Sequence, residues 1–175
     1  MEPVRKIRFV DALAEWGEHE AKGRLRDRKI LMNGPLDAVE VALRMRAKIV
    51  WRLLQDKATE SCVFRFDATI IKRLLFDYTH RWSLEQWLAR INNQDDPSSR
   101  DHYRKLAEAN EQIKPPLLFY FDGLNVVVVD GFNRTAAWIA HHKRGFDYPI
   151  EANVVMRSPR EIARNLLSVS ASTSQ

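Results

Sequence analysis

LLFYFDGLNVVVVDGFNRTAAWIAHH, residues 117 to 142, decides the fold because it contains three structural elements in succession. Asp122-Gly123 separates two apolar runs, which is a strong signal for an antiparallel hairpin. The second run ends directly at Gly131, and an alanine-rich helix is predicted over residues 133–144. A hairpin followed by a strand-to-helix turn predicts a sheet with a helix packed against it.

The rest of the chain carries weaker patterns that predict further elements around this center. They are a short helix around residues 10–17, an amphipathic helix from 36 to 54, a strand within 63–71, a helix after the capping box at 83–86, a helix from 97 that ends by Pro115-Pro116, a strand over 151–156 and a last helix from Ser158. These elements together predict an α+β fold with helices packed on a small mixed sheet.

The predicted order of elements divides the chain into parts of one globular domain. Residues 1–60 are expected to form a mainly helical N-terminal part that packs on a core spanning 61–167. The tail 168–175 is small and polar, with little to bury, and is expected to be disordered.

The composition excludes several classes of protein. No apolar run approaches the roughly 20 residues that a membrane-spanning helix needs, so no membrane insertion is expected. A single cysteine, Cys62, excludes an internal disulfide and a multi-cysteine zinc site. We therefore expect a cytoplasmic protein. The formal net charge of +5 favours nucleic acids, nucleotides or acidic proteins as partners, but only weakly.

The turn at residues 131–135 has the composition of an anion site. A strand that turns into a helix presents backbone N–H groups and the positive end of the helix dipole. Gly131 has no Cβ to obstruct a ligand, and Arg134 can offer a bidentate guanidinium to a phosphate. Asn133 and Thr135 can add neutral donors. A purely structural turn, with Arg134 solvated and Asn133 acting as an N-cap, explains the same residues.

Three stretches in this region resemble the ParB/sulfiredoxin fold. They are PPLLFYFDGLN (115–125), DGFNRTAAW (130–138) and YPIEANVV (148–155), with a glycine-x-x-arginine signature in the turn. Sulfiredoxins have cysteine and histidine after the signature glycine, and partition-type ParB proteins have an acidic residue and an arginine there. This chain has Phe132 and Asn133, so it most resembles the small Osa-type (oncogenic suppression) fertility-inhibition proteins of plasmids.

The resemblance implies an ATPase and DNase that blocks DNA transfer through a conjugation-like type IV secretion system. It places ATP or DNA phosphate on Gly131, Phe132, Asn133, Arg134 and Thr135, with Arg134 stabilising developing charge. Asp130 is the nearest carboxylate and becomes a candidate catalytic residue, with helix capping as its competing role. A divalent cation such as Mg²⁺ is a possible cofactor, and no metal ligands can be named. The alternative is a non-catalytic plasmid or phage regulator that binds DNA or a partner protein with the same fold.

Other candidate residues have equally good structural explanations. The basic stretch Arg24, Arg26, Arg28 and Lys29, with Trp16 nearby, could contact DNA backbone or be a solvated loop. His141 and His142 point about 100° apart on a helix, so they are poorly placed to share a metal ion. Core positions are expected for the tryptophans Trp51, Trp82, Trp87 and Trp138.

Overall fold

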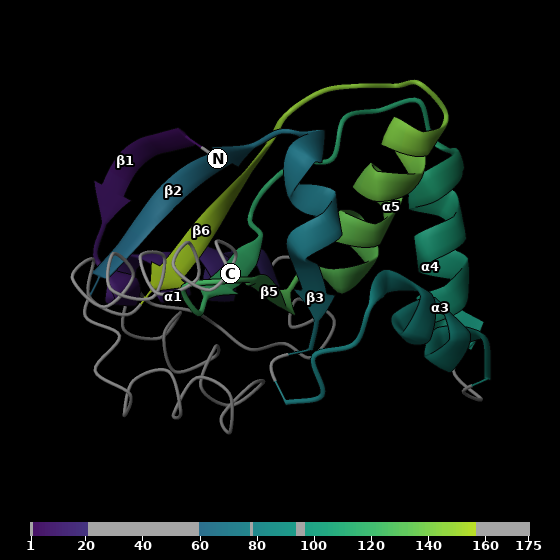
Figure 1. The fold of residues 1–175 in the computed structure, drawn as a ribbon, viewed down its shortest axis with the longest axis horizontal. Coiled ribbons are helices and arrows are strands. Elements are labelled where there is room, and N and C mark those ends of the chain that lie inside the picture. Colours follow the sequence, from purple (N-terminus) through teal and green to yellow (C-terminus); the bar gives the residue numbers. More distant parts are fainter. Residues whose placement is uncertain (1, 21–59, 78, 94–96, 157–175) are drawn as a thin grey trace, which may run out of the picture.

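A computed structural model describes residues 2–20, 60–77, 79–93 and 97–156. Its elements, in chain order, are β1 (Glu2–Ile7), α1 (Phe9–Glu20), β2 (Glu60–Phe66), the 3-10 helix η3 (Ala68–Arg73), β3 (Leu74–Phe76), α3 (Leu84–Asn93), α4 (Pro97–Glu108), β4 (Leu118–Phe121), β5 (Val126–Asp130), α5 (Phe132–Lys143) and β6 (Ile150–Met156). The strands form one six-stranded sheet within the described residues, in the order β1-β2-β6-β4-β5-β3 (Figure 1).

The sheet is mixed. β4 and β5 form the antiparallel hairpin that the sequence predicted, and β6 and β3 pair parallel to β4 and β5 respectively. β1, β2 and β6 pair antiparallel on the far side. The hairpin turn is held by Asp122, whose Oδ1 accepts the backbone N–H groups of Leu124 and Asn125 at 2.8 and 2.6 Å. The predicted α+β class is therefore confirmed.

Helices α3, α4 and α5 cover one face of the sheet, which we call the helical face. Figure 1 shows α4 alongside α5, with α3 near one end of the pair. The core of this face contains the largest apolar side chains from strands and helices, including Phe66, Phe76, Trp87, Phe119 and Trp138. Three of them come from strands and two from helices, so this core joins the helical layer to the sheet.

Helix α1 packs on the opposite face, which we call the α1 face. Phe9, Leu13 and Trp16 of α1 are buried against Leu118, Tyr120, Val127, Val129 and Val155 of the sheet. The sequence predicted this helix but aligned its apolar side through Val10, which is 43% exposed. The buried side is instead the one that carries Trp16.

Local signals elsewhere were confirmed to different degrees. The capping box before α3 forms as predicted, because Ser83 N–H donates to Gln86 Oε1 and Gln86 N–H to Ser83 Oγ. Helix α4 ends at Glu108, before the proline pair that was expected to stop it. The strand predicted within 63–71 is β2, which lies earlier and is followed by η3. The helices predicted over 36–54 and from Ser158 lie outside the described residues.

Strands β1 and β3 were not predicted. β1 is an exposed edge strand with charged residues, and β3 has only three residues, so neither shows a clear alternation of apolar and polar positions. Tertiary pairing with β2 and β5 makes them strands. In the part of the chain that is described, every helix is too short or too polar to cross a bilayer.

Candidate functional site

The turn between β5 and α5 is built as the sequence predicted. β5 ends at Asp130, Gly131 adopts the left-handed conformation with φ of 83°, and α5 begins at Phe132. The first hydrogen bond of the helix runs from Thr135 N–H to Gly131 O at 2.8 Å. The N–H groups of the residues between them therefore have no partner within the helix, as at any helix N-terminus. This end of α5 carries the positive end of the helix dipole.

The reason for glycine at position 131 differs from the one that the sequence suggested. A Cβ added there would lie 2.5 Å from Leu117 Cδ2, which is much closer than van der Waals contact. It would also lie 3.6 Å from one guanidinium nitrogen of Arg134. The space in front of the glycine is thus filled by the protein's own side chains. Close packing and the positive φ explain the glycine without a ligand.

An irregularity in β5 determines where Asp130 points. Leu118 of β4 pairs with Asp130, whereas Phe119 pairs with Val128, so Val129 is an extra residue in β5. Such a bulge re-aims a side chain relative to the simple alternation of a strand. Val129 packs in the α1 face, and Asp130 bonds to Trp16 of α1. Both side chains therefore face α1.

Asp130 is buried and bonded on the α1 face. It is 5% exposed, and its Oδ2 accepts the indole N–H of Trp16 at 2.6 Å. The same oxygen lies 3.6 Å from a guanidinium nitrogen of Arg134, one helical turn further on. The N-cap position of α5 belongs to Gly131, which has no side chain. Asp130 is therefore not the N-cap residue of α5. It contacts Trp16 and Arg134 from the last position of β5.

Arg134 folds back over the start of its own helix. Its guanidinium lies beside Gly131 and Asp130, with 15% of the side chain exposed. Its second terminal nitrogen lies 3.4 Å from Nε2 of His19, in the last turn of α1. The turn thus combines an arginine, a carboxylate and an imidazole with the N-terminus of a helix. Such a group can bind an anion and exchange a proton with it.

The other predicted residues of the turn are mainly packed. Phe132 stacks on Trp87 in the helical face, with ring centroids 6.3 Å apart. Thr135 is fully buried, and its Oγ1 has no hydrogen-bond partner among the described residues. Asn133 Oδ1 is also buried and unpartnered there. Asn133 lies within the helix, so the interpretation of this residue as an N-cap is wrong.

Trp16 and His19 are the residues of the site that the sequence analysis did not assign to it. Trp16 was considered only as a possible neighbor of the basic stretch, but it is 1% exposed and bonded to Asp130. It is therefore not an exposed DNA contact. No local pattern marks either residue, because they lie more than a hundred positions from the turn. Arg24, Arg26, Arg28 and Lys29 lie outside the described residues.

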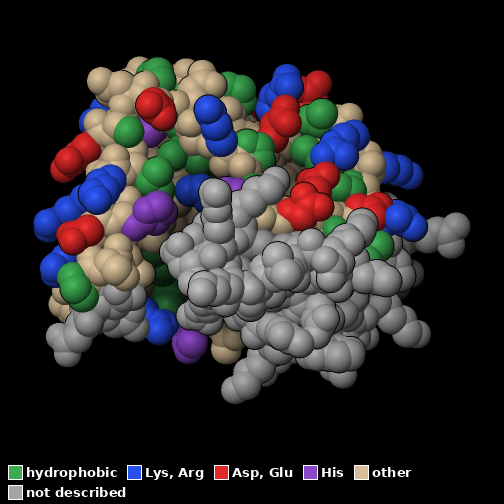
Figure 2. Space-filling model, turned by 180° about the vertical axis from the view of Figure 1, so that it is seen from behind, with side chains coloured by type: hydrophobic (Ala, Val, Ile, Leu, Met, Phe, Trp, Pro, Cys, Tyr) green, Lys and Arg blue, Asp and Glu red, His purple; other side chains and the backbone are tan. Residues whose placement is uncertain are grey.

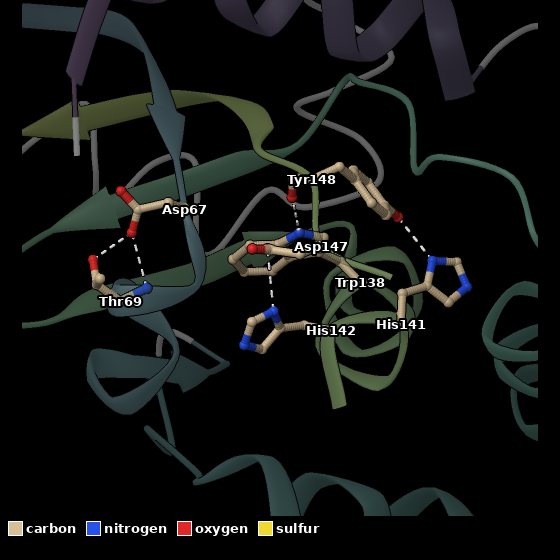
Figure 3. A network of polar contacts seen from close by, with 7 residues as sticks. All are labelled: Asp67, Thr69, Trp138, His141, His142, Asp147 and Tyr148. Carbon is tan, nitrogen blue, oxygen red and sulfur yellow. Dashed lines mark hydrogen bonds and ion pairs between the residues drawn. The ribbon is translucent and has the colours of Figure 1, made fainter. Parts of the chain in front are cut away.

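The two adjacent histidines of α5 diverge, as their spacing predicted (Figure 3). His141 is fully buried, with Nε2 2.9 Å from Leu106 O and Nδ1 2.8 Å from the hydroxyl of Tyr148. Since a carbonyl only accepts, Nε2 carries a proton, and in the neutral imidazole Nδ1 then accepts from the Tyr148 hydroxyl. That hydroxyl also accepts the N–H of Ile113. Burial raises the pKa of Tyr148, so its hydroxyl stays protonated and can bridge Ile113 and His141.

His142 points another way, and its Nδ1 lies 3.2 Å from Oδ1 of the exposed Asp147 (Figure 3). Among the described residues, no three His, Cys, Asp or Glu side chains come together in a way that could hold a metal ion. Asp130 also has Arg134 beside its carboxylate, which disfavours a cation. The described residues therefore contain no ready-made cluster of three such ligands, and the possible Mg²⁺ cofactor stays a prediction.

The outer surface gives little further guidance on ligands. On the face seen in Figure 2, basic and acidic side chains are interspersed, with hydrophobic side chains between them. Examples of paired charges are Arg5 with Glu15 and Arg65 with Glu151. Such pairs neutralise part of the charge on the described surface.

Comparison with known proteins does not assign the chain to a family. No protein-family model, curated protein or solved structure matched it.

Proposed function

We propose that the protein is a phosphate-handling hydrolase of ParB/sulfiredoxin type, an ATPase and DNase that blocks DNA transfer through a conjugation-like type IV secretion system. The observation that carries the proposal is the position of Arg134 in the turn. Its guanidinium is folded over the N-terminus of α5 and lies 3.6 Å from Asp130. A preorganised cation at a helix N-terminus is suited to stabilise charge that develops on a phosphoryl group.

Three parts of the turn have a role in this proposal: the backbone N–H groups, Arg134 and Asp130. The N–H groups at the start of α5 bind phosphate oxygens, and Arg134 adds a charge-assisted contact. Asp130 orients Arg134 and is itself fixed by the indole of Trp16. No step is assigned to a metal ion, because no cluster of three His, Cys, Asp or Glu side chains among the described residues marks a place for one.

The test compares ATP hydrolysis and DNA degradation by the full chain and two arginine variants. Arg134→Ala is expected to lower both rates at least about 100-fold, by loss of charge stabilisation in the transition state. The matched control is Arg144→Ala, at the opposite end of α5, where the exposed guanidinium donates to Ala109 O. This variant should retain wild-type rates. Equal rates in wild type and a folded Arg134→Ala protein would contradict the proposed site.

A second candidate function is a non-catalytic regulator that binds DNA or a partner protein. It is favoured by the packing of the turn, because Leu117 fills the space at Gly131 and Asp130 partly neutralises Arg134. A measurement of DNA transfer separates the two functions. If Arg134→Ala abolishes hydrolysis but inhibition of transfer persists, inhibition does not depend on catalysis, and the regulator is the better description.

A further inference from the structure

His19 reaches the turn because α1 is held against the sheet at one point nearby. Trp16 donates its indole N–H to Asp130, and His19 follows three residues later in the same helix. Residues three apart lie on the same side of a helix. The bond that fixes Trp16 therefore also positions His19 beside Arg134, although its side chain is largely exposed to solvent.

The contact between His19 and Arg134 fits a neutral imidazole better than a charged one. The two nitrogens are 3.4 Å apart, at the long end of the hydrogen-bonding range. An arginine nitrogen can only donate, so a hydrogen bond between the two requires Nε2 of His19 to accept, as it does in a neutral imidazole with its proton on Nδ1. A second positive charge next to Arg134 would be unfavourable in the absence of an anion.

A bound phosphate reverses this preference. The charges of Asp130 and Arg134 offset each other. An anion is therefore attracted less strongly to Arg134 than it would be to an arginine with no carboxylate beside it. When a phosphate accepts the Arg134 donors, it replaces the contact between His19 and Arg134 and gives His19 a negative neighbor. The C-terminal end of α1, where His19 lies, also favours a positive charge. The described charged groups in this region are Arg134, which contacts His19, Asp130, which lies beside Arg134, and Glu15 one turn earlier in α1.

We propose that His19 is an additional phosphate-binding residue of the turn, which takes up a proton when the ligand binds and donates it in a hydrogen bond to the phosphate. This inference rests on the proposed function, since it concerns the same phosphate. It implies that phosphate binding becomes tighter as the pH falls through the range in which imidazoles titrate, because binding and protonation favour each other.

The experiment measures binding of a short oligothymidylate to the full chain at about pH 5.5 and about pH 8. This probe keeps a constant charge over that range, unlike the terminal phosphate of ATP. Wild type is expected to bind about tenfold more tightly at the lower pH, and His19→Gln to change by less than about twofold. The control His142→Gln removes a histidine at the other end of α5, whose partner is Asp147. It should behave as wild type does.

Calorimetry provides a second readout that a merely structural role would not change. In two buffers with different ionisation enthalpies, wild type at neutral pH should take up a fraction of a proton on binding, and His19→Gln clearly less. Equal pH dependence and equal proton uptake in the two proteins would overturn the role of His19 while leaving the proposed function intact. Absence of binding by wild type at both pH values, together with absence of ATP and DNA hydrolysis, would overturn both proposals.

Discussion

Two buried tryptophans on opposite faces of the sheet show how the two faces differ. Trp138, on the helical face, donates its indole N–H to the backbone carbonyl of Tyr148 at 2.9 Å. Trp16, on the α1 face, donates to the carboxylate of Asp130 at 2.6 Å. Both side chains are 1% exposed. The same residue type thus bonds to a neutral backbone group on one face and to a carboxylate on the other.

The surroundings of the two tryptophans extend this difference. On the helical face, the polar groups of His141 and Tyr148 satisfy one another and the backbone. On the α1 face, Glu15 contacts both Arg5 and Asn153, and Asp130 lies beside Arg134. Neutral, satisfied groups stabilise a fold, whereas a partly exposed charged cluster can respond to a ligand. We infer that the helical face mainly provides stability and the α1 face the chemistry.

The turn that connects the two faces should be the most sensitive point. Gly131→Ala is expected to lower the free energy of unfolding by about 3 kcal/mol, through the positive φ and the clash with Leu117. Gly145→Ala is the matched control, because its φ is 84° but its Cβ would meet no atom within 4 Å. Its cost should be about 1 kcal/mol. Urea denaturation measures both, and equal losses would show that packing against Leu117 is unimportant.

The two tryptophans can be compared directly by Trp16→Phe and Trp138→Phe. Each removes one buried indole N–H and some volume, so each should lower the free energy of unfolding by about 2 kcal/mol. Hydrolysis rates of the folded proteins should separate them. Only Trp16→Phe is expected to lower the rates, since Asp130 and His19 depend on α1. A similar loss of activity in both variants would remove the functional distinction between the faces.

The smallest expected effect concerns the hydroxyl of Tyr148. Tyr148→Phe leaves the N–H of Ile113 and Nδ1 of His141 without this partner and should cost about 1 to 2 kcal/mol near neutral pH. Burial raises the pKa of Tyr148 in the folded protein, so its contribution is complete below the ordinary tyrosine pKa of about 10 and declines above it. The free energies of unfolding of wild type and Tyr148→Phe should therefore converge as the pH rises past about 10. A constant difference up to higher pH would contradict this account.

The elements predicted from the sequence are those with strong local signals. Asp122-Gly123 lies between apolar runs, and the capping box at Ser83 precedes a helical stripe, so both could be identified from a few neighboring residues. β1 and β3 lack such signals and depend on pairing with distant strands. The apolar side of α1 was assigned partly wrongly for a related reason. Its short pattern allows more than one alignment, and packing against the sheet selects the side with Trp16.

The sequence by itself determined the hairpin, the strand-to-helix turn at Gly131 and helix α5, because these depend on the conformational preferences of adjacent residues. Only the tertiary structure decided what surrounds Arg134. The extra residue in β5 turns Asp130 toward α1. Helix α1 brings Trp16 and His19 to the turn, although Trp16 is 114 residues away from Asp130 in the sequence and His19 is 115 residues away from Arg134. Contacts over such separations depend on how sheet and helix pack as a whole, which no local pattern encodes.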